Sequence, residues 1–127
     1  MPTLDTSAVV RWLIRDDPAK TASMDALMTS ERHLVVPDAT LIEVIYVLES
    51  YYNLSRDHVA QAIRLMIGQA ALDINRTQWT DIVDTYLTHP KLSCTDIYLA
   101  LDAKRNHREP VYSFDKKSIT QLGAVSP

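Results

Sequence analysis

Short apolar segments followed directly by helical patterns constrain the fold more than any other feature of this sequence. The segment 33–37 is partly β-branched and closed by proline, as is typical of a short strand, and a helical pattern opens at Asp38. Residues 3–4 precede a helical pattern that begins at Ser7, and residues 111–114 precede another. Strands that alternate with helices predict an α/β fold with a mostly parallel sheet.

Capping residues and prolines separate the helical patterns from one another. Pro18 suits the first position of a helix with Asp17 as its cap, and Ser55 suits the cap of a helix over 56–67. Asp38 is expected to cap the helix that it opens. The remaining patterns are a strand or a link at 70–74, a helix at 77–87, a helix that begins near Asp96 and a short helix after 111–115.

The composition indicates one globular domain and excludes some kinds of site. A chain of 127 residues, 46% hydrophobic and 23% charged, fits a single domain over 1–127, and no repeat or linker divides it. The single cysteine, Cys94, excludes an intramolecular disulfide framework and a cysteine-based zinc site. The presence of only two glycines disfavours glycine-rich phosphate-binding loops.

The charge balance and the first residues bear on function and location. A formal net charge of −3 weighs against a passive nucleic-acid-coating protein, but not against a nuclease whose acids are offset by a divalent metal. Residues 1–5 lack a basic start and reach an acid at once, unlike a signal peptide. No apolar run approaches the roughly 20 residues that span a bilayer. We therefore expect a cytoplasmic protein with no membrane partner.

Four acids stand where parallel sheets place ligand sites, beyond the carboxyl ends of strands or on the helix that follows. Asp5 follows the first predicted strand, and Glu43 lies on the helix after the second. Asp96 begins a later helix, and Asp115 follows residues 111–114. Asp5 lies near a terminus that frays unless it is tied into a sheet, so we expect that pairing. We expect the four carboxylates to converge at one sheet edge.

Clustered carboxylates repel one another and therefore need a cation. Near 4 Å, in an effective dielectric of about 20, each pair costs on the order of 4 kcal/mol. Hard oxygen ligands favour Mg²⁺ or Mn²⁺ over zinc. A divalent ion held by carboxylates suits phosphodiester hydrolysis, because it lowers the pKa of a bound water and stabilises the leaving oxygen. Loss of one acid is expected to hold or raise the stability of the metal-free protein.

Each acid also has a simpler structural interpretation. Asp5, Asp96 and Asp115 could each cap the helix that follows, since aspartate is a favoured cap. Glu43 is harder to explain in this way, because its neighbours in sequence are apolar and its carboxylate must turn outward or meet a cation. Taken together, the four positions favour a shared site over coincidental capping.

Four segments of the chain resemble a known family. They are Leu4-Asp5-Thr6-Ser7, then Leu41-Ile42-Glu43-Val44, then Asp96 at the start of an Ala/Leu-rich helix, then Val111-Tyr112-Ser113-Phe114-Asp115. In order and spacing they resemble the PIN domain family, in particular the VapC-like toxin ribonucleases of type II toxin–antitoxin pairs. The resemblance covers essentially the whole chain.

The resemblance implies a three-layer α/β/α domain with a central, mostly parallel sheet of four to five short strands. It implies a metal-dependent endoribonuclease in which one or two Mg²⁺ or Mn²⁺ ions activate a water to cut RNA. It also implies inhibition by a cognate antitoxin protein and a homodimer. Carried over by position, the catalytic acids and metal ligands are Asp5, Glu43, Asp96 and Asp115.

Further roles follow from the same resemblance. The hydroxyls of Thr6 or Ser7, and of Ser113, are expected to hold the carboxylates. Lys117 stands where many relatives carry a further acid, which places a basic side chain near the RNA phosphates instead. The possible RNA contacts are Arg11, Arg15, Lys116 and Lys117.

Two other functions remain open on the sequence alone. The domain could be a non-cleaving binding module whose acids contact a basic partner peptide, and a titration with Mn²⁺ would separate this from a nuclease. It could instead be a metal-dependent phosphoesterase that acts on small substrates. An activity panel that compares RNA with small phosphoesters would test this last function.

Overall fold

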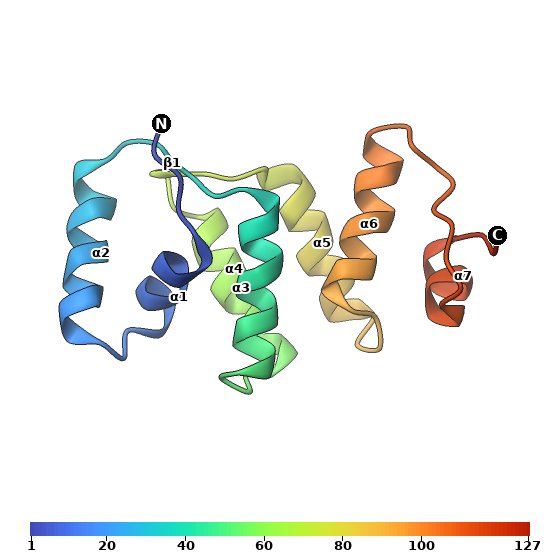
Figure 1. The fold of residues 1–127 in the computed structure, drawn as a ribbon, viewed down its shortest axis with the longest axis horizontal. Coiled ribbons are helices and arrows are strands. Elements are labelled where there is room, and N and C mark those ends of the chain that lie inside the picture. Colours follow the sequence, from blue (N-terminus) through green and yellow to red (C-terminus); the bar gives the residue numbers. More distant parts are fainter. The chain divides into compact units, whose positions relative to one another are not determined.

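Seven helices and one small parallel sheet make up the chain, and the computed structural model describes every residue from Met1 to Pro127 (Figure 1). The elements are α1 (Thr6–Ile14), α2 (Pro18–Ser30), β1 (Leu34–Val35), α3 (Asp38–Ser50), α4 (Arg56–Ile67), β2 (Leu72–Asp73), α5 (Arg76–Thr88), α6 (Cys94–Arg105) and α7 (Lys116–Leu122). None of these helices is long and apolar enough to cross a membrane. The chain forms two compact units, Met1–Arg76 and Thr77–Pro127; a single domain over 1–127 stays a prediction.

The sheet of the first unit ties the N-terminus to the rest of that unit. β1 and β2 are parallel neighbours, with Leu34 opposite Leu72. On the other side of β1, Thr3 forms a parallel bridge to Val35. The Leu4 N–H donates to the Val35 carbonyl at 2.8 Å. The predicted pairing of the terminus is therefore confirmed.

The prediction of four to five strands is wrong, because the chain forms two. Residues 3–4 and 111–114, which the sequence predicts as strands, each form only a single bridge, to Val35 and to Val125 respectively. The first of these segments is short because Asp5 caps α1 directly after it. The three-layer arrangement stays a prediction.

A proline and a side-chain hydroxyl end the pairing of residues 111–114. The Ser113 N–H donates to the Val125 carbonyl at 3.0 Å, as a parallel ladder requires. The next bond of this ladder would need an N–H at residue 127, which is a proline and has none. The Asp115 N–H, which would follow in the ladder, donates to Ser113 Oγ at 2.9 Å. The side chain therefore takes the donor that a longer strand would need.

The helix starts follow local capping chemistry in two of three predicted cases. Asp17 caps α2 with Pro18 as its first residue, and Ser55 caps α4, each accepting a backbone N–H of the first turn. The predicted cap at Asp38 is wrong. Pro37 holds the cap position of α3 with an extended backbone and makes no side-chain cap bond, so Asp38 is the first helical residue.

The core of the first unit lies among its four helices. α1 packs against α2 and α3, and α3 packs against α4. Its helical stripes bury Val9, Val10, Met24, Leu41, Val44, Ile45, Leu48, Val59, Ile63 and Met66. At about 1.5–3 kcal/mol for each fully buried aliphatic side chain, this burial is the main stabilising term of the unit.

The second unit is centred on the packing of α5 against α6. Trp79 of α5 is fully buried, and its ring stacks on Tyr98 of α6 with centroids 5.9 Å apart. At the edge of this contact Arg105 forms an ion pair with Asp81 at 3.1 Å. α7 packs against α6. Tyr98 and the ion pair thus join the same two helices through an apolar contact and a polar one.

Candidate active site

Asp5 lies at the junction between the bridged residues 3–4 and α1. As the cap of α1, its carboxylate accepts the Ala8 N–H at 3.0 Å and the Ser7 hydroxyl at 2.8 Å. These hydrogen bonds, from the Ala8 backbone first and from Ser7 second, lower the pKa of the exposed Asp5 carboxyl below 3.8. Both go to Oδ1, which leaves Oδ2 for another partner. Asp5 is therefore ionised at neutral pH and has one oxygen to offer.

Glu43 faces the start of α1 from α3. It is exposed and lines a pocket of about 260 Å³ that Thr6, Ser7 and Arg11 line from α1. Its carboxylate makes no hydrogen bond or ion pair. Since Ser7 lines this pocket and also donates to Asp5, a single hydroxyl connects the surroundings of the two acids.

A threonine that the sequence analysis did not single out positions α3 relative to Asp5. The Thr40 hydroxyl donates to the carbonyl of Leu4, the residue before Asp5, at 3.1 Å. This bond crosses between segments 36 residues apart and lies one turn before Glu43. It therefore holds the start of α3 against the segment that carries Asp5.

Asp96 lies in the first turn of α6 but does not cap it. Ser93 caps this helix and accepts the Asp96 N–H at 3.1 Å. The half-buried Asp96 side chain lines a small pocket of about 60 Å³, together with Tyr112, Ser113 and Ser118 among others. Its carboxylate makes no hydrogen bond or ion pair. Simple capping thus does not explain Asp96.

Asp115 caps α7 and repeats the arrangement of Asp5. Its carboxylate accepts the Ser118 hydroxyl at 3.0 Å and the Ser118 N–H at 3.2 Å, both on Oδ2, which leaves Oδ1 for another partner. The Ser118 hydroxyl first, and the Ser118 N–H second, lower the pKa of Asp115 below 3.8. Ser113, expected to hold this carboxylate, binds the Asp115 backbone N–H instead.

The four acids fall into two pairs, one in each unit. Asp5 and Glu43 belong to Met1–Arg76, and Asp96 and Asp115 belong to Thr77–Pro127. Within each pair one carboxylate caps a helix, and the other makes no hydrogen bond or ion pair. The convergence of all four at one site stays a prediction.

One of the hydroxyls that hold the acids differs from those expected. Ser7 donates to the Asp5 carboxylate, whereas Thr6 lines the adjoining pocket. Ser118 donates to Asp115. The spacing of Ser118 in the sequence indicates this role, because a hydroxyl three residues after an aspartate cap lies in the first turn of the helix that the cap begins.

Comparison with known proteins identifies the family. The PIN domain family matches residues 3–123, which is nearly the whole chain. The chain belongs to the PIN domain family. PIN domains are generally nucleases and typically use divalent metal ions such as Mg²⁺. No curated protein matches the chain.

The donor chemistry of this PIN domain suits a hard divalent cation. Hydrogen bonds lower the pKa of Asp5 and of Asp115, and each keeps one oxygen without a hydrogen bond. Ionised carboxylate oxygens are the ligands that Mg²⁺ and Mn²⁺ prefer. No group of three or more His, Cys, Asp or Glu side chains in the structure is arranged to hold a metal ion. The four proposed acids, two in each unit, are of the chemical type that binds such an ion.

The electrostatics of the caps change one expectation from the sequence. Mutual repulsion among carboxylates would raise their pKa values, but hydrogen bonds lower the pKa of Asp5 and of Asp115. Both residues also hold a helix start. Removing either side chain is therefore expected to cost stability through the lost cap rather than to relieve repulsion.

The basic side chains proposed to touch RNA are not equally available. Arg11 pairs with Asp16 at 3.0 Å and still lines the Glu43 pocket. Arg15 donates two bonds to Asp25, at 3.0 and 2.5 Å, so both of its terminal nitrogens are engaged within the first unit. Lys116 and Lys117 are exposed in the first turn of α7, next to Asp115.

The Arg15–Asp25 pair between α1 and α2 gives a pH-dependent term in stability. The hydrogen bond from Arg15 lowers the pKa of Asp25 below 3.8. A carboxyl whose pKa is lower in the folded than in the unfolded protein stabilises the fold at pH values above its unfolded-state pKa. This contribution is lost as the pH falls through the folded-state pKa. We expect Asp25→Asn to melt at a slightly lower temperature than wild type at pH 7, with the difference closing below pH 3.8. Thermal unfolding followed by circular dichroism across this range checks it; a difference that does not narrow as the pH falls below 3.8 contradicts it.

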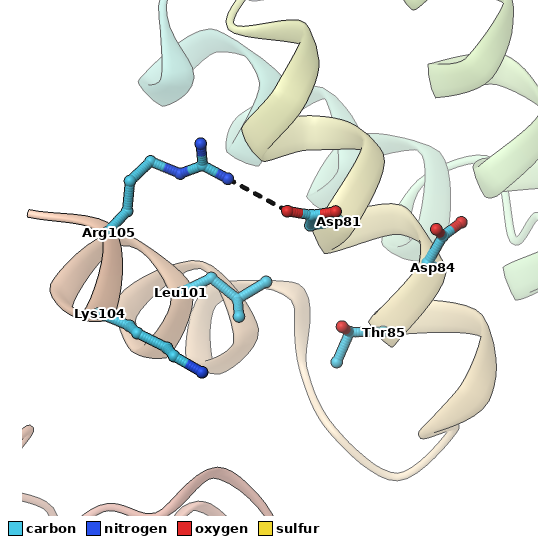
Figure 2. Close-up of a pocket in the computed structure, with 6 residues that line it drawn as sticks. All are labelled: Asp81, Asp84, Thr85, Leu101, Lys104 and Arg105. Carbon is cyan, nitrogen blue, oxygen red and sulfur yellow. Dashed lines mark hydrogen bonds and ion pairs between the residues drawn. The ribbon is translucent and has the colours of Figure 1, made fainter.

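A further pocket of the second unit is separate from the proposed ligands. It measures about 490 Å³ and lies between α5 and α6, where Figure 2 shows the Arg105 guanidinium turned toward Asp81. Its lining is Asp81, Asp84, Thr85, Leu101, Lys104 and Arg105. Acids on one helix face bases on the other, so the pocket has no single charge with which to attract a phosphate or a metal ion.

Proposed function

We propose that this PIN domain is a metal-dependent endoribonuclease that hydrolyses RNA phosphodiester bonds. The observation that carries the proposal is the family match over residues 3–123, which includes all four acids. Their chemistry supports it. Asp5 and Asp115 cap helices and each keeps one oxygen without a hydrogen bond, and Glu43 and Asp96 make no competing polar contact.

The proposed ligands of Mg²⁺ or Mn²⁺ are Asp5, Glu43, Asp96 and Asp115. When bound, the ion would polarise the phosphate and lower the pKa of the attacking water. The protein would supply ligands that are already deprotonated, since Ser7 and Ser118 hold Asp5 and Asp115 in the charged form. Because each hydroxyl also fixes which oxygen is free, it orients that ligand.

Chelation is the first test of this function. With EDTA, cleavage of a labelled single-stranded RNA should fall to background, and excess Mg²⁺ or Mn²⁺ should restore it. The reason is that the proposed reaction needs a divalent cation held by the carboxylates. The same RNA with excess Ca²⁺ serves as a control for ionic strength. Undiminished cleavage in EDTA would contradict the proposed chemistry.

The proposal extends to the biological role suggested by the sequence. We propose a VapC-like toxin of a type II toxin–antitoxin pair, cytoplasmic, homodimeric and inhibited by a cognate antitoxin. The segments around Asp5, Glu43, Asp96 and Asp115 support this role through their resemblance to such toxins. A neighbouring reading frame that encodes a DNA-binding fold with a tail rich in arginine and apolar residues would be the most direct support.

A non-cleaving binding module is the second candidate. One observation favours it: the carboxylates of Asp5, Glu43 and Asp115 are exposed. In that case the exposed carboxylates would contact a basic partner peptide. Calorimetric titration with Mn²⁺ separates the two, because a module without metal gives no heat of binding and no change on substitution of the four acids.

A further inference from the structure

The segment 111–114 turns two aromatic rings to solvent. Val111 and Ser113 are half-buried, whereas Tyr112 is 66% exposed and Phe114 is 82% exposed. This alternation is that of an extended chain, in which every second side chain lies on the same side. Two residues of extended chain span about 6–7 Å, so the backbone atoms from which the two rings project are separated by roughly that distance.

Phe114 has no structural reason to be exposed. It is the only phenylalanine of the chain and more exposed than any other large apolar side chain. Unlike tyrosine, it has no polar group to hydrate, so its exposure leaves a large apolar surface in water. An exposed apolar group of this size next to a proposed site is typical of a contact surface.

The neighbours of the two rings indicate what that surface contacts. Tyr112 lines the pocket of Asp96, and Phe114 immediately precedes Asp115. Lys116 and Lys117 follow, both exposed. Exposed rings beside cations match the surfaces that bind single-stranded nucleic acid, where bases stack on the rings and phosphates meet the lysines. The positive charge next to the rings favours this ligand over an apolar protein segment.

We propose that Tyr112 and Phe114 form a stacking surface for two unpaired RNA bases, next to Asp115. The inference rests on the proposed ribonuclease function and adds the residues that contact the bases. Bases must be free to stack, so single-stranded RNA is the substrate and paired RNA is excluded from this surface. The rings add affinity without sequence choice, since every base has a face to stack.

The test measures binding separately from cleavage. A short labelled single-stranded RNA and an abasic chain of the same length are titrated in EDTA against wild type, Phe114→Ala and Tyr112→Ala. Each variant should lose on the order of tenfold in affinity for the RNA and leave the affinity for the abasic chain unchanged. Phe114→Trp should retain the affinity and gain tryptophan quenching on binding RNA that wild type lacks. Tyr51→Ala, which removes a ring that is 76% exposed in the first unit, is the matched control.

Several results would overturn the inference. They are wild-type affinity in Phe114→Ala, an equal loss for the abasic chain, no binding of the RNA by the wild type, or a change from dimer to monomer with RNA binding unchanged. Cleavage by the wild type is assayed in parallel with Mg²⁺. If the wild type cleaves RNA and Phe114→Ala binds RNA as tightly as the wild type does, only the stacking surface is refuted. If RNA binding depends on the bases but the wild type does not cleave, only the proposed nuclease is refuted.

Discussion

Asp5→Asn should lower RNA cleavage by more than about 100-fold and leave the melting temperature nearly unchanged. The loss should exceed the 10- to 100-fold that removal of an outer partner of a metal ligand typically costs. Asparagine caps helices about as well as aspartate. To cap, however, its oxygen must face the Ala8 N–H, which turns its NH₂ group to the side where Asp5 offers Oδ2. That group carries hydrogens and cannot bind a cation.

Matched variants separate the cap from the chemistry. Asp17 is also an aspartate cap, on α2, and Asp17→Asn should leave both cleavage and melting temperature unchanged. Asp5→Ala should lose cleavage and also about 0.5–2 kcal/mol of stability, because it removes the cap. Cleavage by Asp5→Asn at the wild-type rate would show that Asp5 is not a ligand. Gel-based cleavage assays and thermal unfolding of the same samples give both readouts.

Trp79→Ala should have the largest effect on stability, a loss of about 3–5 kcal/mol in the free energy of unfolding. Trp79 is fully buried and stacks on Tyr98, so truncation leaves a cavity and removes an aromatic contact between α5 and α6. A typical domain is stable by about 5–15 kcal/mol, so this loss is a large share of the total. Urea denaturation followed by circular dichroism measures the loss.

An exposed leucine provides the control for this stability measurement. Leu65 of α4 is 53% exposed, and Leu65→Ala should change the free energy of unfolding by no more than about 0.5 kcal/mol. If Trp79→Ala and Leu65→Ala cost the same, the contact between α5 and α6 contributes little and Trp79 does not centre the second unit.

The parts of the fold that depend on local chemistry could be predicted from the sequence. Asp17 with Pro18, and Ser55, mark helix starts because a cap and its partner lie within one turn. The extent of a strand depends instead on which distant segment supplies its partner. Residues 111–114 have the composition of a strand, but the partner segment places Pro127, which has no N–H, where the next donor is needed, and the Ser113 hydroxyl takes the Asp115 N–H.

The site could be predicted to the same degree. The positions of Asp5 and Asp115 at the ends of extended segments follow from the order of the elements. The hydroxyl that holds Asp115 depends on where α7 begins, and this start places Ser118 rather than Ser113 at the carboxylate. Whether four acids from distant segments meet is a matter of tertiary structure that periodicity and spacing do not encode.

The split use of the two oxygens at Asp5 and Asp115 narrows the side chains that either position can accept. Serine, threonine and asparagine can start the helix but lack a second charged oxygen. Glutamate has both charges, but it is not among the favoured caps. Of the twenty side chains, only aspartate can begin the helix and present a charged oxygen at the same time. A single substitution at either position is therefore expected to remove the helix cap, the charged oxygen or both.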